Sequence, residues 1–237
     1  ATVQVPDFPN RHLQTISRGL PWYRRSRLGG HFFPAAHGLP IKADVKEEPE
    51  LFALVNGKRS RRQWCVSNPE VVRRTAEAIK KAFRKRPDRI DIGIGPNDGG
   101  GFCECENCRA LDAGDWDPFA GEISVTDRYV HFFNAVLEEV HKEFPGKKLC
   151  FYSYHTYMRP PVREKPDPHI VPAFAPITLC RVHGINNPVC PDRSYYAHII
   201  ESWGELVPEI YERGYYFNLA CPGFPFSKVH CIREEIP

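Results

Sequence analysis

The sequence contains no apolar run that approaches the roughly 18 residues needed to cross a membrane. Charge of one sign is also scarce, because 32 Lys and Arg residues against 29 Asp and Glu residues give a formal net charge of +3. So small an excess does not indicate nucleic-acid binding, and the basic stretches at 59–62 and 80–86 are more simply solvated surface. We therefore expect neither a membrane nor a nucleic acid as a partner.

A secretory leader is not recognisable either, and the chain starts at Ala1 rather than Met, as expected for a segment of a longer protein. The nine cysteines are an odd number, so disulfide bonds alone cannot use all of them. Spread over 237 residues, they do not resemble the dense disulfide framework of a small secreted protein. Each cysteine therefore needs its own interpretation.

The most informative stretch is residues 89–109, RIDIGIGPNDGGGFCECENCR. Ile90, Ile92 and Ile94 alternate with Asp and Gly residues, which predicts a strand. An Asn-Asp pair, three glycines and three cysteines follow this strand. Because parallel α/β folds place their chemistry at the carboxyl ends of strands, the loop is a candidate site. A flexible loop with incidental cysteines is the alternative, and its cysteines argue against it.

Apolar periodicity predicts three helices. The first starts at the cap sequence 67–70, and the second starts at a capping box in residues 124–127. The third carries Ile199, Trp203, Leu206, Ile210 and Tyr211 and ends at Gly214. Strands are expected at 3–5, 63–66, 90–94, 149–154, 170–179 and 215–220.

The alternation of strands and helices predicts an α/β fold with a parallel sheet. Long loops follow the strands and short loops follow the helices, so one edge of the sheet should carry the function. A (β/α) TIM-type barrel fits better than a doubly wound sheet, because no glycine-rich phosphate turn follows the first strand. The strands number fewer than eight. We therefore expect residues 1–237 to form a single, incomplete (β/α)-barrel domain whose C-terminal strands are missing.

Four cysteines are candidates for a metal site. Cys65 lies at the end of the strand at 63–66, and Cys103, Cys105 and Cys108 follow the strand at 90–94. If both strands end at the same edge, their thiols converge and can bind zinc tetrahedrally. Disulfides and free thiols are alternatives. A structural zinc that clamps the long loop is favoured over a catalytic one.

Cys180 and Cys190 flank another loop. They are candidates for a disulfide, which requires Cα atoms within about 7 Å of each other. Two independent buried thiols are the alternative, which a reducing compartment would favour.

Four stretches resemble the bacterial "domain of unknown function 4838" family, namely residues 49–59, 65–70, 97–108 and 154–161. The most specific of them is the Asn-Asp pair followed by C-x-C-x-x-C. The resemblance covers most of the chain from about Arg24 onward. It implies a glycosidase-like barrel and a carbohydrate substrate or ligand. The compartment stays open, with an extracytoplasmic location in bacteria as the candidate. The resemblance also implies contacts with an N-terminal domain similar to that of alpha-glucuronidases, and with further barrel strands of the same chain.

Glycoside hydrolysis needs a carboxylic acid to protonate the leaving oxygen and a second group to stabilise or attack the sugar carbon. Asp98, at the end of the isoleucine-rich strand, is our candidate general acid. A partly apolar pocket lined by Trp64 or Tyr154 would keep this carboxyl group protonated. The alternative is a turn cap in Pro-Asn-Asp-Gly. No second carboxylate stands out, since Glu104 and Glu106 on the same loop are weaker candidates.

Aromatic and basic residues near strand ends are candidates for sugar binding, because aromatic faces stack on sugars and arginines donate hydrogen bonds. The candidates are Arg27, His31, Trp64, Asn97, Tyr154 and His155. His155 stands where the resemblance implies an aromatic or small residue. Two function classes follow, a carbohydrate-active enzyme of the glycoside hydrolase type and a non-catalytic glycan-binding or metal-clamped barrel module. Paired carboxylates would favour the first class.

Overall fold

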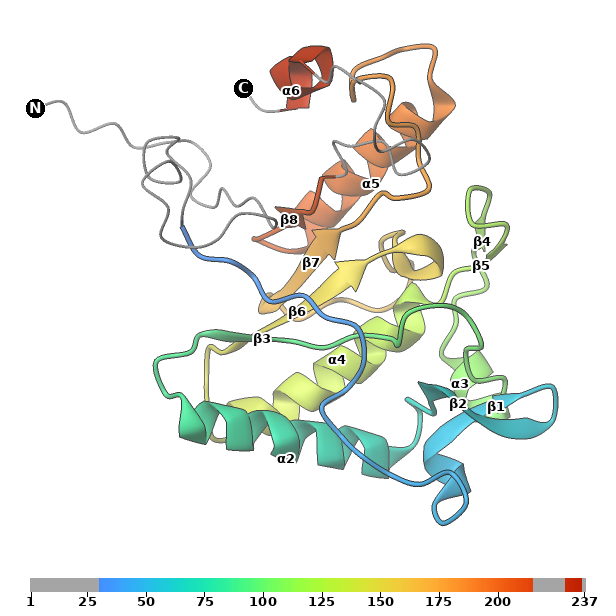
Figure 1. Ribbon diagram of the computed structural model, residues 1–237, viewed down its shortest axis with the longest axis vertical. Helices are drawn as coiled ribbons and strands as arrows, with labels where there is room; N and C mark the ends of the chain where they lie inside the picture. The colour runs from blue at the N-terminus through green and yellow to red at the C-terminus, as the bar shows by residue number, and fades with distance from the viewer. Residues whose placement is uncertain (1–29, 215–228, 236–237) are drawn as a thin grey trace, which may run out of the picture.

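The computed structural model describes residues 30–214 and 229–235. A four-stranded sheet forms its centre, and its strands are β3 (Asp91–Gly93), β6 (Lys148–Ser153), β7 (Ile170–Phe174) and β8 (Tyr211–Glu212). All neighbouring strands of this sheet are parallel. The predicted α/β class with a parallel sheet is therefore confirmed, whereas the described residues do not form a complete barrel (Figure 1).

Helices and two small hairpins surround the sheet (Figure 1). The helices are α2 (Pro69–Lys85), α3 (Glu106–Ala110), α4 (Thr126–His141), α5 (Pro191–Leu206) and α6 (Val229–Glu235), with 3₁₀ turns η1 (Pro49–Leu51) and η2 (His155–Tyr157). The hairpins are β1 (Phe52–Val55) with β2 (Lys58–Trp64), and β4 (Trp116–Asp117) with β5 (Glu122–Ile123). None of the described helices is both long and apolar enough to cross a membrane.

One face of the sheet is buried under the three long helices. Phe151 of β6 lies between helices, with its ring centroid 5.0 Å from that of Phe133 in α4 and 5.9 Å from that of Trp203 in α5. Helix α2 packs against α4 and buries Ile79 and Phe83 in the same core. Within the described residues, the three long helices therefore form one layer on one face of the sheet. The strands lie side by side in chain order, β3-β6-β7-β8.

The other face of the sheet is covered in part by residues 33–38. Ala36 pairs with Phe151 of β6, and Gly38 exchanges backbone hydrogen bonds of 2.9 and 3.1 Å with Pro96 and Gly95. This approach requires glycine in β3, because a Cβ on Gly93 would lie 1.5 Å from the carbonyl oxygen of Pro34. The segment thereby reaches the carboxyl end of β3.

Helix α2 begins as its sequence predicts. The side chain of Asn68 accepts a 2.9 Å hydrogen bond from the backbone N–H of Glu70, and Pro69 is the first helical residue. The helix ends before Pro87. The buried stripe of this helix starts at Val71.

The predicted capping box of α4 is wrong. The residue before the helix is Val125, which has no capping side chain. Asp127 is buried, and its carboxylate accepts hydrogen bonds of 2.6–2.9 Å from three backbone N–H groups, those of Val162, Arg163 and Glu164. Three amide donors from a distant loop satisfy a buried carboxylate better than the single donor of a capping box, so tertiary contacts decide its orientation.

The third predicted helix is too long at its carboxyl end. Helix α5 ends at Leu206, and Pro208 follows, so Ile210 is not helical and Tyr211 starts β8. The predicted strands at 3–5 and 215–220 lie outside the described residues.

The predicted strand at 170–179 ends at Phe174 and contains Pro172. Ala175 donates to Ser153 of β6, so the residues of β7 with odd numbers point their N–H groups toward β6. The nitrogen of Pro172 faces the other side, where β8 pairs only with Ala173 and Phe174. The missing N–H of the proline therefore leaves no gap in the β6 ladder.

Candidate functional site

A cavity of about 280 Å³ opens at the carboxyl ends of the parallel strands. Its lining residues are Asp98 after β3, Tyr152 and Tyr154 at the end of β6, Ala175 and Ile177 after β7, Arg213 after β8, and His37 from the segment over β3. Every strand of the sheet therefore contributes to it. The carboxyl edge is where open and barrel-type parallel sheets bind their ligands, which makes this cavity the candidate site.

Aromatic and basic groups form one wall of the cavity. Arg213 donates a 2.8 Å hydrogen bond to the hydroxyl group of Tyr152, and its guanidinium carbon lies 5.2 Å from the centroid of that ring. The ring centroid of His37 lies 4.8 Å from that of Tyr152 and 5.9 Å from that of Tyr154. The wall therefore offers flat apolar faces beside hydrogen-bond donors.

Asp98 lies at the rim of the cavity. One of its carboxylate oxygens is 4.0 Å from Nε2 of His37, which is ion-pair distance but too long for a hydrogen bond. Its side chain is 71% exposed, so the partly apolar enclosure that we had expected is absent from the described residues. The exposure of Asp98 has a local cause, because Gly99 and Gly100 beside it carry no side chains and lie in open space. A Cβ on either glycine would meet no atom within 4 Å.

Trp64 does not enclose Asp98 as the sequence interpretation proposed. Its ring stacks on Phe52 across the β1–β2 hairpin, with centroids 4.7 Å apart and planes inclined by 22°. Tyr154 does line the cavity with Asp98. One of the two expected aromatic neighbours is therefore in place, and the other belongs to the hairpin.

The backbone on both sides of Asp98 is fixed by a buried side chain that sequence reasoning missed. Gln63 of β2 is 1% exposed, and its Nε2 donates to the carbonyl oxygens of Asn97 and Gly99 at 2.8 and 3.0 Å. Its Oε1 accepts from the N–H of Asn97 at 2.9 Å. The only signal in the sequence is an uncharged polar residue that ends a run of basic ones. Gln63 is therefore a positioning residue for Asp98.

The remaining sugar-binding candidates do not line this cavity in the described part of the chain. The side-chain amide of Asn97 donates to the carbonyl oxygen of Arg62 at 2.7 Å, and His31 forms a close ion pair with buried Asp91 of β3. His155 follows Tyr154 with a φ angle of 47°. Arg27 lies outside the described residues. Their roles in ligand binding stay predictions.

The four candidate metal ligands converge, as the sequence predicts. The sulfur atoms of Cys65, Cys103, Cys105 and Cys108 all lie within 4.8 Å of one another. Cys65 Sγ is 3.7 Å from Cys105 Sγ and 3.9 Å from Cys108 Sγ. Tetrahedral zinc with Zn–S bonds of about 2.3 Å spaces its sulfur ligands about 3.8 Å apart. This buried cluster can therefore hold a metal ion.

Backbone pairing to β1 brings the two cysteine segments together. Cys65 donates its N–H to the carbonyl oxygen of Leu51 at 2.9 Å, and Glu104 donates to that of Leu54 at 2.7 Å. Leu54 in turn donates its N–H to the sulfur of Cys103 at 3.3 Å. The hairpin itself turns at Asn56-Gly57, where both residues have positive φ, the signature of a tight hairpin turn.

The thiols of Cys103 and Cys108 differ in pKa. Hydrogen bonds from the thiols of Cys108 and Cys65 lower the pKa of Cys103, and they outweigh its burial. Backbone N–H groups of Cys105 and Leu54 act in the same direction. The same contacts raise the pKa of Cys108. Cys103 therefore loses its proton more readily than Cys108. This prepares it for metal binding, because cysteine binds a metal ion as the thiolate.

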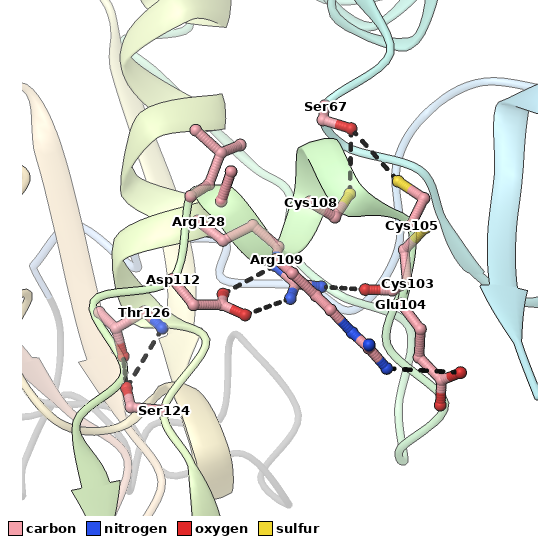
Figure 2. Close-up of polar contacts among 12 residues, drawn as sticks. Ser67, Cys103, Glu104, Cys105, Cys108, Arg109, Asp112, Ser124, Thr126 and Arg128 are labelled. Carbon is pink, nitrogen blue, oxygen red and sulfur yellow. Dashed lines mark hydrogen bonds and ion pairs between the residues drawn. The ribbon is translucent and has the colours of Figure 1, made fainter.

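A buried arginine donates a hydrogen bond to the cysteine loop (Figure 2). Arg128 of α4 is 4% exposed and donates to Asp112 Oδ1 at 2.9 Å and to the carbonyl oxygen of Cys103 at 2.7 Å. Ser67 lies on the other side of the cluster and accepts a hydrogen bond from Cys108 Sγ at 3.1 Å. Neither residue was predicted, because their spacing in the sequence gives no sign of these contacts.

A second cavity of about 590 Å³ lies on the other side of the cysteine loop and is lined in part by Cys103, Arg109 and Arg128. Four of its charged residues form two pairs. Arg128 pairs with Asp112, and Arg109 lies 3.9 Å from Glu104 (Figure 2). These groups are thus engaged with each other, and the cavity at the strand ends remains the better candidate for a ligand site.

The predicted disulfide between Cys180 and Cys190 is not formed, and both residues are free thiols. His183 lies with them, its Nδ1 3.4 Å from Cys180 Sγ. We had not predicted a role for His183.

Comparison with known proteins identifies the family. Residues 20–237 match the family described as "Domain of unknown function (DUF4838)". No curated protein and no solved structure matches the chain. The match spans most of the sequence and agrees with the four motifs that indicated this family. The chain therefore belongs to the DUF4838 family.

Proposed function

We propose that the protein is a carbohydrate-active enzyme of the glycoside hydrolase type, with its substrate in the cavity at the strand ends and Asp98 as general acid. One observation carries this proposal. The cavity is lined by residues that follow every strand of the parallel sheet, and Asp98 is the carboxylate among the described lining residues. Asp98 lies in the loop after β3, where Gln63 fixes the backbone on both sides of it. A backbone held in this way keeps a carboxyl group within the tolerance that proton transfer requires.

The strand order supports an incomplete (β/α) barrel. The parallel strands follow one another in chain order, and the three long helices share one core with a single face of the sheet. A doubly wound sheet would reverse its strand order and place helices on both faces. The further strands of a barrel would come from outside the described residues.

The chemistry of the cavity suits a sugar. A sugar ring presents apolar C–H faces and polar hydroxyl edges, and the cavity offers the rings of Tyr152 and Tyr154 beside Arg213 and His37. Its volume of about 280 Å³ falls at the lower end of ligand pockets. One sugar unit, the end of a chain or a single substituent, is therefore the proposed occupant.

Asp98 needs a partner for hydrolysis. Retaining enzymes place two carboxyl groups about 5–5.5 Å apart, and inverting enzymes about 6.5–9.5 Å apart. Asp98 is the single carboxylate that lines the cavity within the described part of the chain. The second group therefore comes from residues outside that part, or the substrate supplies its own nucleophile.

We further propose that the four-cysteine cluster holds a structural zinc ion. Four protein thiolates fill a tetrahedral shell and leave no open position for substrate, which is the pattern of structural zinc. The same loop carries Asp98 and three of the ligands, so the metal would hold the loop whose backbone Gln63 fixes on its other side. The zinc thereby stabilises the catalytic loop without joining in the chemistry.

The test is a screen of glycans and aryl glycosides with wild type and Asp98→Asn. We expect Asp98→Asn to fold and to lose about a hundredfold or more of its turnover on unactivated glycosides. Substrates with a very good leaving group should lose less, because they need little proton donation. Asp88→Asn is the matched control, since Asp88 is as exposed as Asp98 but precedes β3 and contacts Arg86. Equal turnover of wild type and Asp98→Asn on every substrate would contradict the assignment.

A non-catalytic glycan-binding module is the second candidate. The observation that favours it is the solitary, 71% exposed carboxylate of Asp98 among the lining residues. Calorimetric titration with the same glycans distinguishes the two candidates. Binding without turnover that is weakened by Tyr154→Ala and unchanged by Asp98→Asn supports the binding module.

A further inference from the structure

We propose that Cys180, His183 and Cys190 form a second zinc site, in which the described residues supply three ligands and leave the fourth position to solvent. This site lies in the loop between β7 and α5 and shares no residue with the four-cysteine cluster. The proposal is independent of any glycosidase activity, because it concerns metal binding by these three side chains alone.

The geometry of the three ligand atoms fits a metal ion. The two sulfur atoms and one imidazole nitrogen lie within 4.8 Å of one another, and Cys180 Sγ is 3.4 Å from His183 Nδ1. Tetrahedral zinc, with Zn–S bonds of about 2.3 Å and Zn–N bonds of about 2.0 Å, spaces a sulfur and a nitrogen ligand about 3.6 Å apart. A small contraction of the loop around the ion would therefore complete the site.

The ligands are held by two local structures that are tied together. Cys180 and His183 sit on one turn, in which the backbone N–H of Val182 donates to Cys180 Sγ at 3.4 Å. Cys190 precedes the first residue of α5. Asp192, in the first turn of that helix, accepts the N–H of Cys180 at 2.6 Å. This hydrogen bond joins the turn to the helix start and keeps the ligands together before a metal binds.

The ligand types select zinc and leave one position open. Thiolate and imidazole ligands suit borderline-soft cations, and a Cys₂His set with a water or substrate ligand is an established arrangement for zinc with an exchangeable position. His183 is exposed, Cys180 is half-buried and Cys190 is buried, so the site faces solvent on the side of the histidine. Solvent can therefore supply the fourth ligand.

The loop that carries this site also contacts α6. His230 of α6 lies 2.6 Å from the carbonyl oxygen of Val182, through its Nε2 atom. Gly184 leaves room for the carboxylate of Glu234, since a Cβ there would lie 2.1 Å from a carboxylate oxygen. A metal ion that fixes Cys180 and His183 would thus also fix the backbone on which α6 rests.

The experiment counts zinc in protein that has been reduced, reconstituted with zinc and freed of excess metal. Elemental analysis of wild type should find about two zinc ions per chain, one in each cluster. His183→Ala and Cys180→Ser should each retain about one. His198→Ala is the matched control, because His198 is another exposed histidine, on α5, and should retain two. Because His183 is exposed, its substitution leaves the core intact, and circular dichroism checks that the fold is unchanged.

Cobalt substitution identifies the ligands. Thiolate-to-cobalt charge-transfer absorption grows with the number of thiolates, so the spectrum lost in His183→Ala should be weaker than that lost in Cys65→Ser. Wild type that binds a single zinc ion, still present in His183→Ala, would overturn the proposal. So would a linked Cys180–Cys190 peptide that persists after reduction and reconstitution. Failure of the four-cysteine site instead would show as one zinc ion that is lost in His183→Ala and kept in Cys65→Ser.

Discussion

The two cysteine clusters use similar ligands in opposite surroundings. In the first, the cluster of Cys65, Cys103, Cys105 and Cys108, three of the four residues are buried, and backbone pairing to β1 and the side chain of Arg128 enclose them. In the second, the cluster of Cys180, His183 and Cys190, the ligands occupy a surface loop and the histidine is exposed. A complete, buried set of ligands serves stability, whereas an incomplete, solvent-facing set leaves room for exchange.

Both clusters stabilise a thiolate with backbone N–H groups. Burial alone would raise the pKa of Cys180, but the backbone N–H groups of His183 and Val182 lower it overall. At Cys103 the neighbouring thiols contribute most, and backbone groups add to them. The buried cluster therefore relies on its own members, while the exposed cluster relies on the turn in which it sits.

The largest expected effect tests this contrast by the same substitution at both clusters. Cys108→Ser should abolish zinc binding at the buried cluster and lower the free energy of unfolding by more than about 3 kcal/mol, because a structural metal is lost. Cys190→Ser should cost far less, since serine is itself a favoured residue before a helix. Urea unfolding with parallel zinc analysis measures both. Equal costs would remove the distinction between the two clusters.

A smaller effect is expected from Arg128, the buried arginine that holds the loop of the first cluster. Arg128→Met leaves the largely buried carboxylate of Asp112 without its partner and should cost about 2–3 kcal/mol. Asp112→Asn in the same protein should restore part of this loss, because the unpaired charge is removed. Urea unfolding of the two single variants and the double variant gives the coupling. A cost below about 1 kcal/mol for Arg128→Met would show that the ion pair does not support the loop.

The smallest effect concerns the hydroxyl group beside the buried sulfur atoms. Ser67→Ala removes the acceptor of the Cys108 thiol but no metal ligand. We expect one zinc ion to stay bound at this cluster, with an affinity reduced by about tenfold. Competition with a colorimetric chelator measures the change. Complete loss of the ion from Ser67→Ala would mean that Ser67 belongs to the ligand set and that the cluster is not closed by its four cysteines.

Local patterns predicted the elements that local physics decides. The alternating isoleucines before Gly95 and the cap at Asn68 gave β3 and α2 correctly, because strand alternation and helix capping act over a few residues. The convergence of Cys65 with the later cysteines was also predicted, but for a different reason, because β2 pairs with β1 in a separate hairpin and does not end at the edge of the parallel sheet. The helical pattern failed at Tyr211, because the apolar spacing continued past Pro208 while the helix did not.

The candidate site depended on contacts that no local pattern contains. His37 reaches the cavity because the backbone around Ala36 runs along the sheet. Gly93 lets this backbone come close to β3, but a glycine in a predicted strand does not by itself reveal such a contact. Gln63 and Arg128 act through carbonyl oxygens of distant loops, so their side-chain types alone do not reveal a role. The sequence thus located the catalytic candidate, and the structure was needed for the residues that hold it.

The segment over β3 also has a consequence for synthesis of the chain on the ribosome. Ala36 pairs with Phe151, roughly 115 positions later, so this pairing has to wait until β6 has been made, although Gly38 can already pair with Gly95 and Pro96. At about 5–20 residues per second, this wait lasts on the order of 6–23 seconds. A protease pulse on stalled nascent chains should therefore cleave near residues 33–38 when synthesis stops before β6, and should spare them when it stops well beyond it.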